Sequence, residues 1–161
     1  MLSFSVLGTT MATFCGQNLG AGEIGRIKKG IKTAIGMAWI WCIGVIIVTN
    51  LFAPAMISML TSSTKTEVVD TASLYLRINT TLYFVTAMIT IIRNSMQGIG
   101  DRVTPIISSM IELVGKVVIV IVLVPKLGYM GVIISEPIVW VLMVIPLIVQ
   151  IIRTPILKEK A

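Results

Sequence analysis

The chain has 161 residues, of which 56% are hydrophobic and only 12% are charged, with no histidine and a mean hydropathy of +0.99. A soluble domain carries about 25% charged residues, so this composition leaves too few to cover a surface that faces water. The net charge of +6 would suit a nucleic-acid partner only if the basic residues shared one polar face, but they stand in short groups between apolar runs. The composition therefore indicates an all-α protein, a polytopic transmembrane helical bundle in a lipid bilayer, and no nucleic-acid partner.

Residues 1–16 begin the series of apolar stretches, and we expect them to be the end of a truncated transmembrane helix. The apolar part reaches only about 21 Å at 1.5 Å per residue, against about 30 Å for the hydrocarbon core. A Gly-rich, basic cytoplasmic loop is expected at 17–32. The four predicted spanning helices and their connections follow in order: helix 33–53, extracytoplasmic connection 54–73, helix 74–92, cytoplasmic loop 93–102, helix 103–124, extracytoplasmic turn 125–129, helix 130–152 and cytoplasmic tail 153–161.

The loops divide the Lys and Arg residues unevenly between the two sides of the membrane. If the loops alternate, nine basic residues lie on one side and two on the other. Cytoplasmic loops carry the excess of Lys and Arg, so the basic side is expected to face the cytoplasm. This places the C-terminus in the cytoplasm and the chain in the cell membrane.

A polar stripe runs along the predicted helix 74–92 and past its end. Its residues recur at steps of three and four, so they share one face of a helix. Such a face should avoid lipid: either it packs against another helix through hydrogen bonds or it lines a wet cavity, and both remain open. Arg77 and Arg93, near opposite ends, are expected to extend to the two interfaces. The candidate cavity-lining residues are Asn79, Tyr83, Thr86, Thr90 and Asn94, and the stripe continues to Gln97.

Three charged residues within the predicted spans form a candidate cation or polar centre: Glu112, Lys116 and Glu136. Glu112 lies about 13 Å into its helix, and Lys116 shares its face four residues on. A buried charge is costly unless paired or hydrated, which makes such residues functional candidates. Either Glu112 binds a proton or Na⁺ under the influence of Lys116, or the two form a self-neutralising structural pair. Glu136 precedes Pro137, and broken helices hold cations in transporters, although Glu136 lies only about 9 Å into its span, where water could solvate it.

A series of motifs follows in order along nearly the whole chain. They are Thr13-Phe-Cys-Gly-Gln-Asn-Leu-Gly-Ala-Gly22 with a basic run after it, Tyr75-Leu-Arg-Ile78, Gln97-Gly-Ile-Gly-Asp101 leading to Pro105, Glu112-Leu-Val-Gly-Lys-Val117, Gly128-Tyr-Met-Gly131 and Glu136-Pro-Ile-Val-Trp140. Together they resemble the multidrug and toxin extrusion (MATE) family of cation-coupled efflux transporters. The loop residues that carry the resemblance are Gly16, Gln17, Gly20, Gly22, Gln97, Gly98, Gly100 and Asp101.

The resemblance implies two six-helix lobes around a central cleft that opens to each side in turn, with this chain forming part of the C-terminal lobe. Residues 1–16 would end the second helix of that lobe, and the missing N-terminal lobe would lie upstream or be a separate subunit. The implied activity is antiport of small amphiphilic, often cationic substrates against H⁺ or Na⁺, with no other cofactor. Some relatives carry a carboxylate on the helix that matches 74–92, whereas the stripe here is neutral, so the roles of Glu112 and Glu136 do not come from the family.

Two other interpretations remain open. The chain could be a truncated or partner-dependent membrane module without transport activity of its own, or half of a related flippase for lipid-linked saccharides. An enzyme is not expected, because no nucleophile stands beside a base. No metal site is expected either, since Cys15 and Cys42 stand apart in apolar stretches without histidine.

Overall fold

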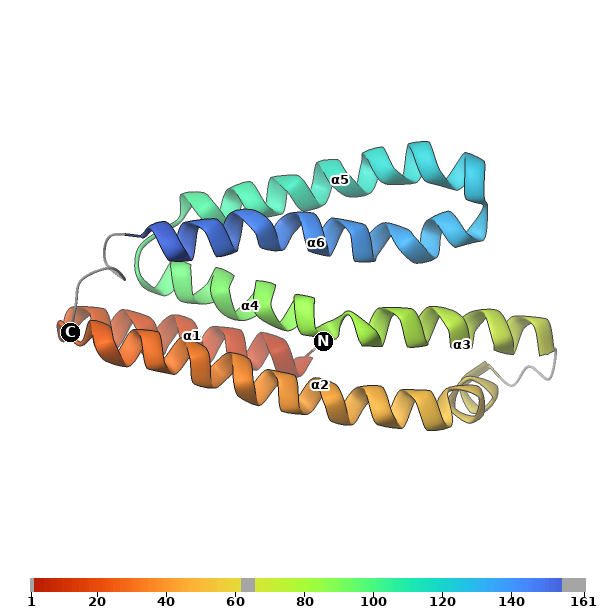
Figure 1. The fold of residues 1–161 in the computed structure, drawn as a ribbon, viewed down its shortest axis with the longest axis horizontal. Coiled ribbons are helices and arrows are strands. Elements are labelled where there is room, and N and C mark those ends of the chain that lie inside the picture. Colours follow the sequence, from red (N-terminus) through yellow and green to blue (C-terminus); the bar gives the residue numbers. More distant parts are fainter. Residues whose placement is uncertain (1, 62–65, 155–161) are drawn as a thin grey trace.

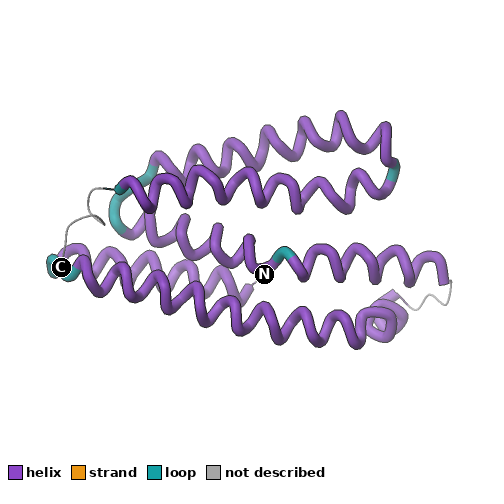
Figure 2. Tube along the Cα trace, viewed as in Figure 1, coloured by secondary structure: helices purple, strands orange, loops and turns teal. Residues whose placement is uncertain are grey.

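The computed structural model describes residues 2–61 and 66–154, and six helices account for nearly all of this part of the chain (Figures 1 and 2). No strand occurs within these ranges. The predicted all-α class is therefore confirmed. The helices are α1 (Leu2–Gly20), α2 (Ile24–Thr61), α3 (Thr66–Thr81), α4 (Tyr83–Gly98), α5 (Val103–Leu127) and α6 (Tyr129–Arg153).

Three of these helices, α2, α5 and α6, are each long and apolar enough to cross a membrane. Helices α3 and α4 meet at a break at Leu82, where they are bent by 44°, and together they form a fourth candidate span. The 25 residues of α5 reach about 37 Å at 1.5 Å per residue, more than the hydrocarbon thickness of about 30 Å. The predicted helical membrane bundle is confirmed, with three candidate spans, or four if α3 and α4 cross the membrane as one bent span.

The connections are shorter than the loops predicted from the sequence. Helix α1 continues to Gly20 and α2 begins at Ile24, so most of the predicted loop 17–32 is helical. Gly22 makes the turn with φ 74°, a left-handed conformation that glycine adopts without steric cost. The basic residues of the predicted loop lie on the first turns of α2, because long Lys and Arg side chains reach water from a helix. Likewise, α2 passes through Pro54 to Thr61, within the predicted connection 54–73.

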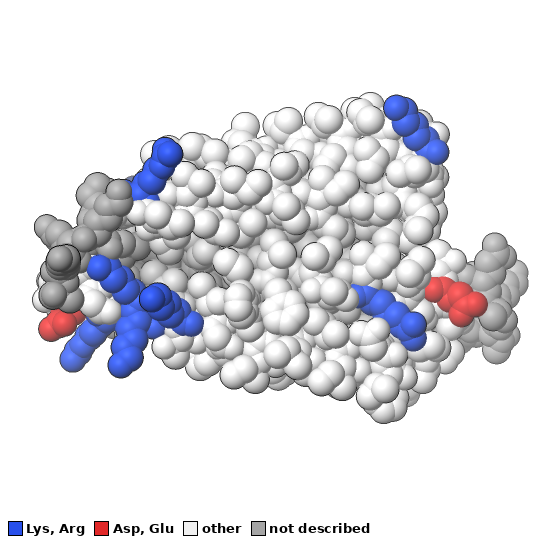
Figure 3. Space-filling model, in the orientation of Figure 1, with Lys and Arg blue, Asp and Glu red and all other residues white. Residues whose placement is uncertain are grey.

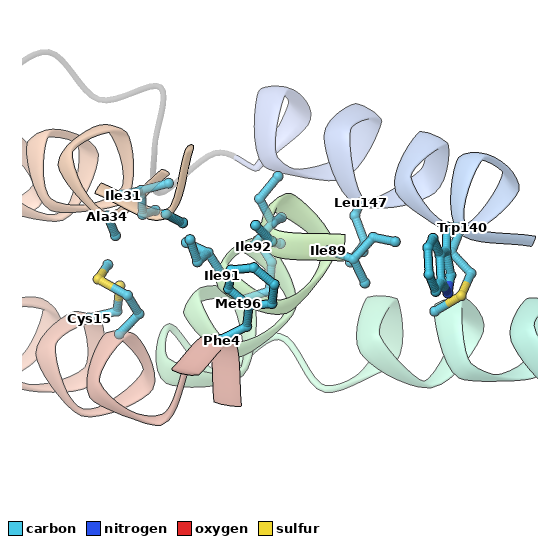
Figure 4. Packing of buried hydrophobic residues seen from close by; sticks show 14 of the residues in the cluster. Phe4, Cys15, Ile31, Ala34, Ile89, Ile91, Ile92, Met96, Trp140 and Leu147 are labelled. Atoms are coloured by element: carbon cyan, nitrogen blue, oxygen red, sulfur yellow. The ribbon is translucent and has the colours of Figure 1, made fainter. Parts of the chain in front are cut away.

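Helix α4 lies between two groups of helices and contacts all five others (Figure 1). On one side, α5 and α6 form an antiparallel hairpin closed by Gly128, whose φ is 56°. On the other side, α2 runs the length of the bundle, beside α1 over its first part and beside α3 over its second. The core therefore forms around α4: Ile91 and Met96 belong to the same buried cluster as Cys15 of α1, and Ile89 points toward Leu147 of α6 (Figure 4).

The contact between α1 and α4 leaves no room for side chains. Gly8, Ala12 and Gly16 recur every four residues on one face of α1, a spacing of small residues that lets membrane helices touch. A Cβ on Gly98 of α4 would lie 2.3 Å from the Ala12 carbonyl oxygen, and a Cβ on Gly8 would lie 2.6 Å from Asn94 Nδ2. At Gly98 the close atom belongs to the backbone and cannot give way, so this interface depends on glycine there, whereas at Gly8 the Asn94 side chain would have to move.

The outer faces of the bundle are apolar. Leu113, Val117 and Ile121 recur at steps of four on α5, and each is more than half exposed. Exposed apolar faces of this extent are unfavourable in water but suit the hydrocarbon of a bilayer. Lys and Arg gather at the end of the bundle that holds the α1–α2 connection, whereas the middle of the visible face is uncharged (Figure 3). This division between a charged end and an apolar body is typical of a membrane protein.

We expect Gly98→Ala to lower the thermal stability of the purified protein in detergent, because the new Cβ would collide with the α1 backbone. Overpacking of this kind costs about 1–3 kcal/mol. Gly44→Ala is the matched control, since a Cβ at Gly44 meets nothing within 4 Å. The melting temperature, measured by size-exclusion chromatography after heating, should fall for Gly98→Ala and stay level or rise for Gly44→Ala. Equal melting temperatures for wild type and Gly98→Ala would contradict the close approach.

Candidate functional site

The charged residues of α5 meet an arginine from α4. Glu112 Oε1 accepts a hydrogen bond from Lys116 Nζ at 3.1 Å, and Glu112 Oε2 lies 4.0 Å from Arg93 Nη1. Arg93 also donates to the hydroxyl of Ser109. The side chains are partly buried, with exposed fractions of 34% for Glu112, 30% for Arg93 and 41% for Lys116. One carboxylate thus lies between two cations that come from two helices, and we call these three residues the charged centre.

Arg93 was expected to extend to a membrane interface, but its side chain turns to α5 instead. The distances of Arg93 and Ser109 from the ends of their helices indicate this contact. Arg93 lies five residues before the end of α4 at Gly98, and Ser109 lies six residues after the start of α5 at Val103. A tight antiparallel connection brings such positions to nearly the same level. Sequence reasoning missed this contact because it did not use the shortness of the connection.

Glu136 lies apart from the charged centre, partly buried on α6. In the described part of the chain it forms no ion pair, but Glu136 and Lys116 both act electrostatically on the Tyr75 hydroxyl of α3. Pro137 has no backbone N–H, so the Ile133 carbonyl one turn back lacks its helical donor. Helices α3, α5 and α6 therefore bring a carboxylate, a lysine and a phenol into one neighbourhood. Across residues 2–61 and 66–154, no group of three His, Cys, Asp or Glu side chains could hold a metal ion.

The polar stripe is divided by the break at Leu82, and much of it faces α1. The ring of Tyr83 contacts Phe4 edge to face with centroids 5.8 Å apart, and Thr90 and Asn94 lie against Gly8. These three positions favour the helix-packing interpretation over the cavity.

The hydroxyl and amide groups of the stripe mostly bond to their own helix. Thr90 Oγ1 donates to the Thr86 carbonyl at 2.9 Å, Asn94 Nδ2 to the Thr90 carbonyl at 2.8 Å, and Asn79 Nδ2 to the Tyr75 carbonyl at 3.0 Å. Asn79 Oδ1 and Thr86 Oγ1 are buried without a partner among the described residues. Buried polar atoms of this kind are costly to leave unpaired, so these two mark where the stripe has capacity for a further partner.

The two Gly-rich motifs meet at the same end of the bundle. Gly16 lies near the end of α1, where a Cβ would stand 3.3 Å from the Gly98 carbonyl oxygen at the end of α4. Gly100 continues the second motif with φ 89°. Both motifs therefore serve tight turns and close packing. Of the remaining loop residues, Gln17, Gly20, Gly22 and Gln97 are exposed.

Asp101 joins the α4–α5 connection to the end of α6. Its Oδ1 accepts the backbone N–H groups of Val103 and Thr104, each at 3.1 Å, which the first turn of α5 leaves without partners. Its Oδ2 accepts the Thr104 hydroxyl at 2.7 Å and the Gln150 amide at 3.3 Å. Burial opposes ionisation, but these hydrogen bonds outweigh it and hold the pKa of the Asp101 carboxyl below its usual value of 3.8.

The apolar helices and the few charges held between them define a multi-pass membrane protein. The family model MatE matches residues 1–123, and the chain therefore belongs to the MatE family, a family of transporters. The match includes Arg93, Glu112, Lys116 and both Gly-rich motifs, whereas Glu136 lies beyond its end. Comparison with curated proteins and with solved structures yields no match.

The hydrogen bonds to Asp101 make the stability of the protein depend on pH. Because the folded state favours the ionised carboxyl, this contribution is complete above the usual pKa of 3.8 and is lost as the pH falls through the lower folded-state value. Asp101→Asn should therefore melt at a lower temperature than wild type at pH 7 and decline less steeply between about pH 5 and pH 3. Asp70→Asn, at an exposed carboxyl in the first turns of α3, is the control. Parallel declines of wild type and Asp101→Asn would refute the assignment.

Proposed function

We propose that this chain is part of the C-terminal lobe of a cation-coupled efflux antiporter, which exports amphiphilic, often cationic compounds by alternating access. Membership of a transporter family over residues 1–123 supports transport in general. The observation that carries the finer proposal is the charged centre, because it places ionised groups between two helices of a membrane bundle. Ionisable residues within spanning helices mark ion and substrate pathways in membrane proteins.

The distribution of charge supports an orientation with the basic end in the cytoplasm. Arg26, Lys29 and Lys32 lie on the first turns of α2, and Arg102 lies in the α4–α5 connection. Helix α1 ends beside α4 at Gly98, so these residues share one end of the bundle. By the positive-inside rule this end faces the cytoplasm of a cell membrane. The end of α6 lies at the same end of the bundle, where Gln150 donates to Asp101, and the tail from residue 155, expected in the cytoplasm, lies outside the described residues.

A central cleft requires a second lobe, which we place upstream in the same chain or in a separate subunit. Transporters are commonly built from two structural repeats, with the substrate site at the interface between the repeats. The exposed apolar faces of α2 and α5 are available both to lipid and to such a lobe.

Glu112 and Glu136 offer different settings for the coupling ion. At Glu112, a bound Na⁺ would be repelled by Arg93 and Lys116, which both lie within 4.0 Å of the carboxylate. A proton would instead remove the negative charge of Glu112 and so weaken its ion pair with Arg93 of α4. Glu136 has no ion pair among the described residues and precedes Pro137 on α6, so it is the better setting for Na⁺. We therefore assign proton coupling to Glu112 and any Na⁺ coupling to Glu136.

Gradient-driven dye efflux tests this assignment in the complete transporter reconstituted in vesicles. An imposed proton gradient should drive ethidium transport, and Glu112→Gln should slow it at least about tenfold, because a hydrogen bond to a charged group contributes about 1.5–3 kcal/mol. Glu112→Asp, which keeps the charge, should retain part of the rate. Asp70→Asn is the matched control and should transport normally.

The outcomes separate the alternatives. Unchanged efflux by Glu112→Gln at equal incorporation would reduce the charged centre to a structural role. A Na⁺-driven rate that falls in Glu136→Gln but not in Glu112→Gln would move coupling to α6. If neither gradient drives dye efflux by the wild-type protein, the antiporter proposal fails, and flipping of lipid-linked saccharides becomes the activity to assay.

A further inference from the structure

A groove between α1 and α2 is charged at one end and apolar along the rest of its length. It has a volume of about 380 Å³, and Arg26 and Lys29, on the first turns of α2, line one part of it. Met11 and Phe14 of α1 and Met37 of α2 line the remainder. Met37 lies eight residues beyond Lys29, roughly 12 Å along the helix. The character of the groove therefore changes along α2 from cationic to apolar.

The apolar end continues into two further hollows along α2, of about 250 and 550 Å³. Met37 and Trp41 line both of these hollows, and the larger one extends to Val48 and Met56. From Lys29 to Val48 the helix rises about 28 Å. The hydrocarbon of one leaflet is about 15 Å thick, so this path is long enough for a complete acyl chain.

The positive charge at the mouth of the groove is only weakly compensated. Among the described residues, the one acidic group paired with it is Glu23, whose Oε2 lies 3.9 Å from Arg26 Nε. Both side chains are more than half exposed, and ion pairs in such positions contribute little. The mouth also lies at the end of the bundle where Lys and Arg gather (Figure 3). An anionic group would therefore find a favourable potential there.

We propose that this groove binds an anionic phospholipid. The phosphate lies between Arg26 and Lys29, and one acyl chain follows the apolar floor past Met37 to Trp41. Three properties of the groove select this ligand: a cationic mouth at the basic end of the bundle, an apolar continuation, and apolar lining side chains that are exposed at the outer surface of α2, such as Met37 and Trp41. Basic pockets between spanning helices bind anionic headgroups in this way. The site goes beyond the transport activity and does not depend on it, so each proposal can fail without the other.

Quenching of tryptophan fluorescence by brominated lipid tests the site, because bromine quenches only on contact and Trp41 is 56% exposed. The intact protein is reconstituted in vesicles of equal parts phosphatidylglycerol and phosphatidylcholine, with bromine on the acyl chains of one lipid or the other. Brominated phosphatidylglycerol should quench more strongly, with a preference of about fivefold for each basic side chain that contacts the headgroup. The excess quenching should disappear in Trp41→Phe.

Two double variants show which basic residues cause the preference for phosphatidylglycerol. Arg26→Gln with Lys29→Gln should abolish it, whereas Lys32→Gln with Arg102→Gln removes two charges from the same end outside the groove and should preserve most of it. Thr33→Phe fills the groove from an exposed position and should also abolish the preference with the charges intact, which covers the case of a misfolded charge variant. Equal quenching by the two lipids, or an equal loss in both charge pairs, would overturn the proposal.

Discussion

The close approach of α1 and α4 at Gly8, Ala12 and Gly98 sets the position of every other helix. Within a bilayer the helices gain little from burying apolar surface, so they are held together by van der Waals packing and hydrogen bonds. At Gly98 a Cβ would stand 2.3 Å from the Ala12 carbonyl oxygen, so the two backbones lie closer there than a side chain on α4 would allow. Since α4 also contacts the remaining four helices, its position relative to α1 determines where α2, α5 and α6 pack.

The two faces of α4 then serve different purposes. The face with Thr90 and Asn94 lies against α1, is neutral and bonds mainly to its own helix. The face with Arg93, the one charged residue of α4, meets Glu112 on α5. Asp101 ties the start of that hairpin to its end through Gln150. A change in the charge of Glu112 would therefore act on the contact between α4 and the α5–α6 hairpin.

Features that depend on residues close together in the sequence could be predicted, whereas contacts between residues far apart in the sequence could not. The membrane spans could be predicted from the length of the apolar runs, because a bilayer imposes a minimum length on a spanning helix. The contact between Glu112 and Lys116 could be predicted because residues four apart share one face of a helix. The ends of the helices could not be predicted in this way, because these helices continue through lysines and prolines. The break between α3 and α4 at Leu82 could not be predicted either, because no glycine or proline marks it. Gln150 lies 49 residues from Asp101, so the sequence contains no local sign of that contact.

We propose that these helices form one lobe of a larger transporter, and the mass of the native complex tests this most directly. An antibody to the C-terminal residues would capture the protein from its own membranes in detergent for native mass spectrometry and peptide sequencing. Two repeats in one transporter predict a mass of at least about twice the 17.5 kDa of this chain. They also predict apolar peptides that the present sequence does not contain. A complex made only of this chain, at 17.5 kDa or a simple multiple of it, would contradict the claim.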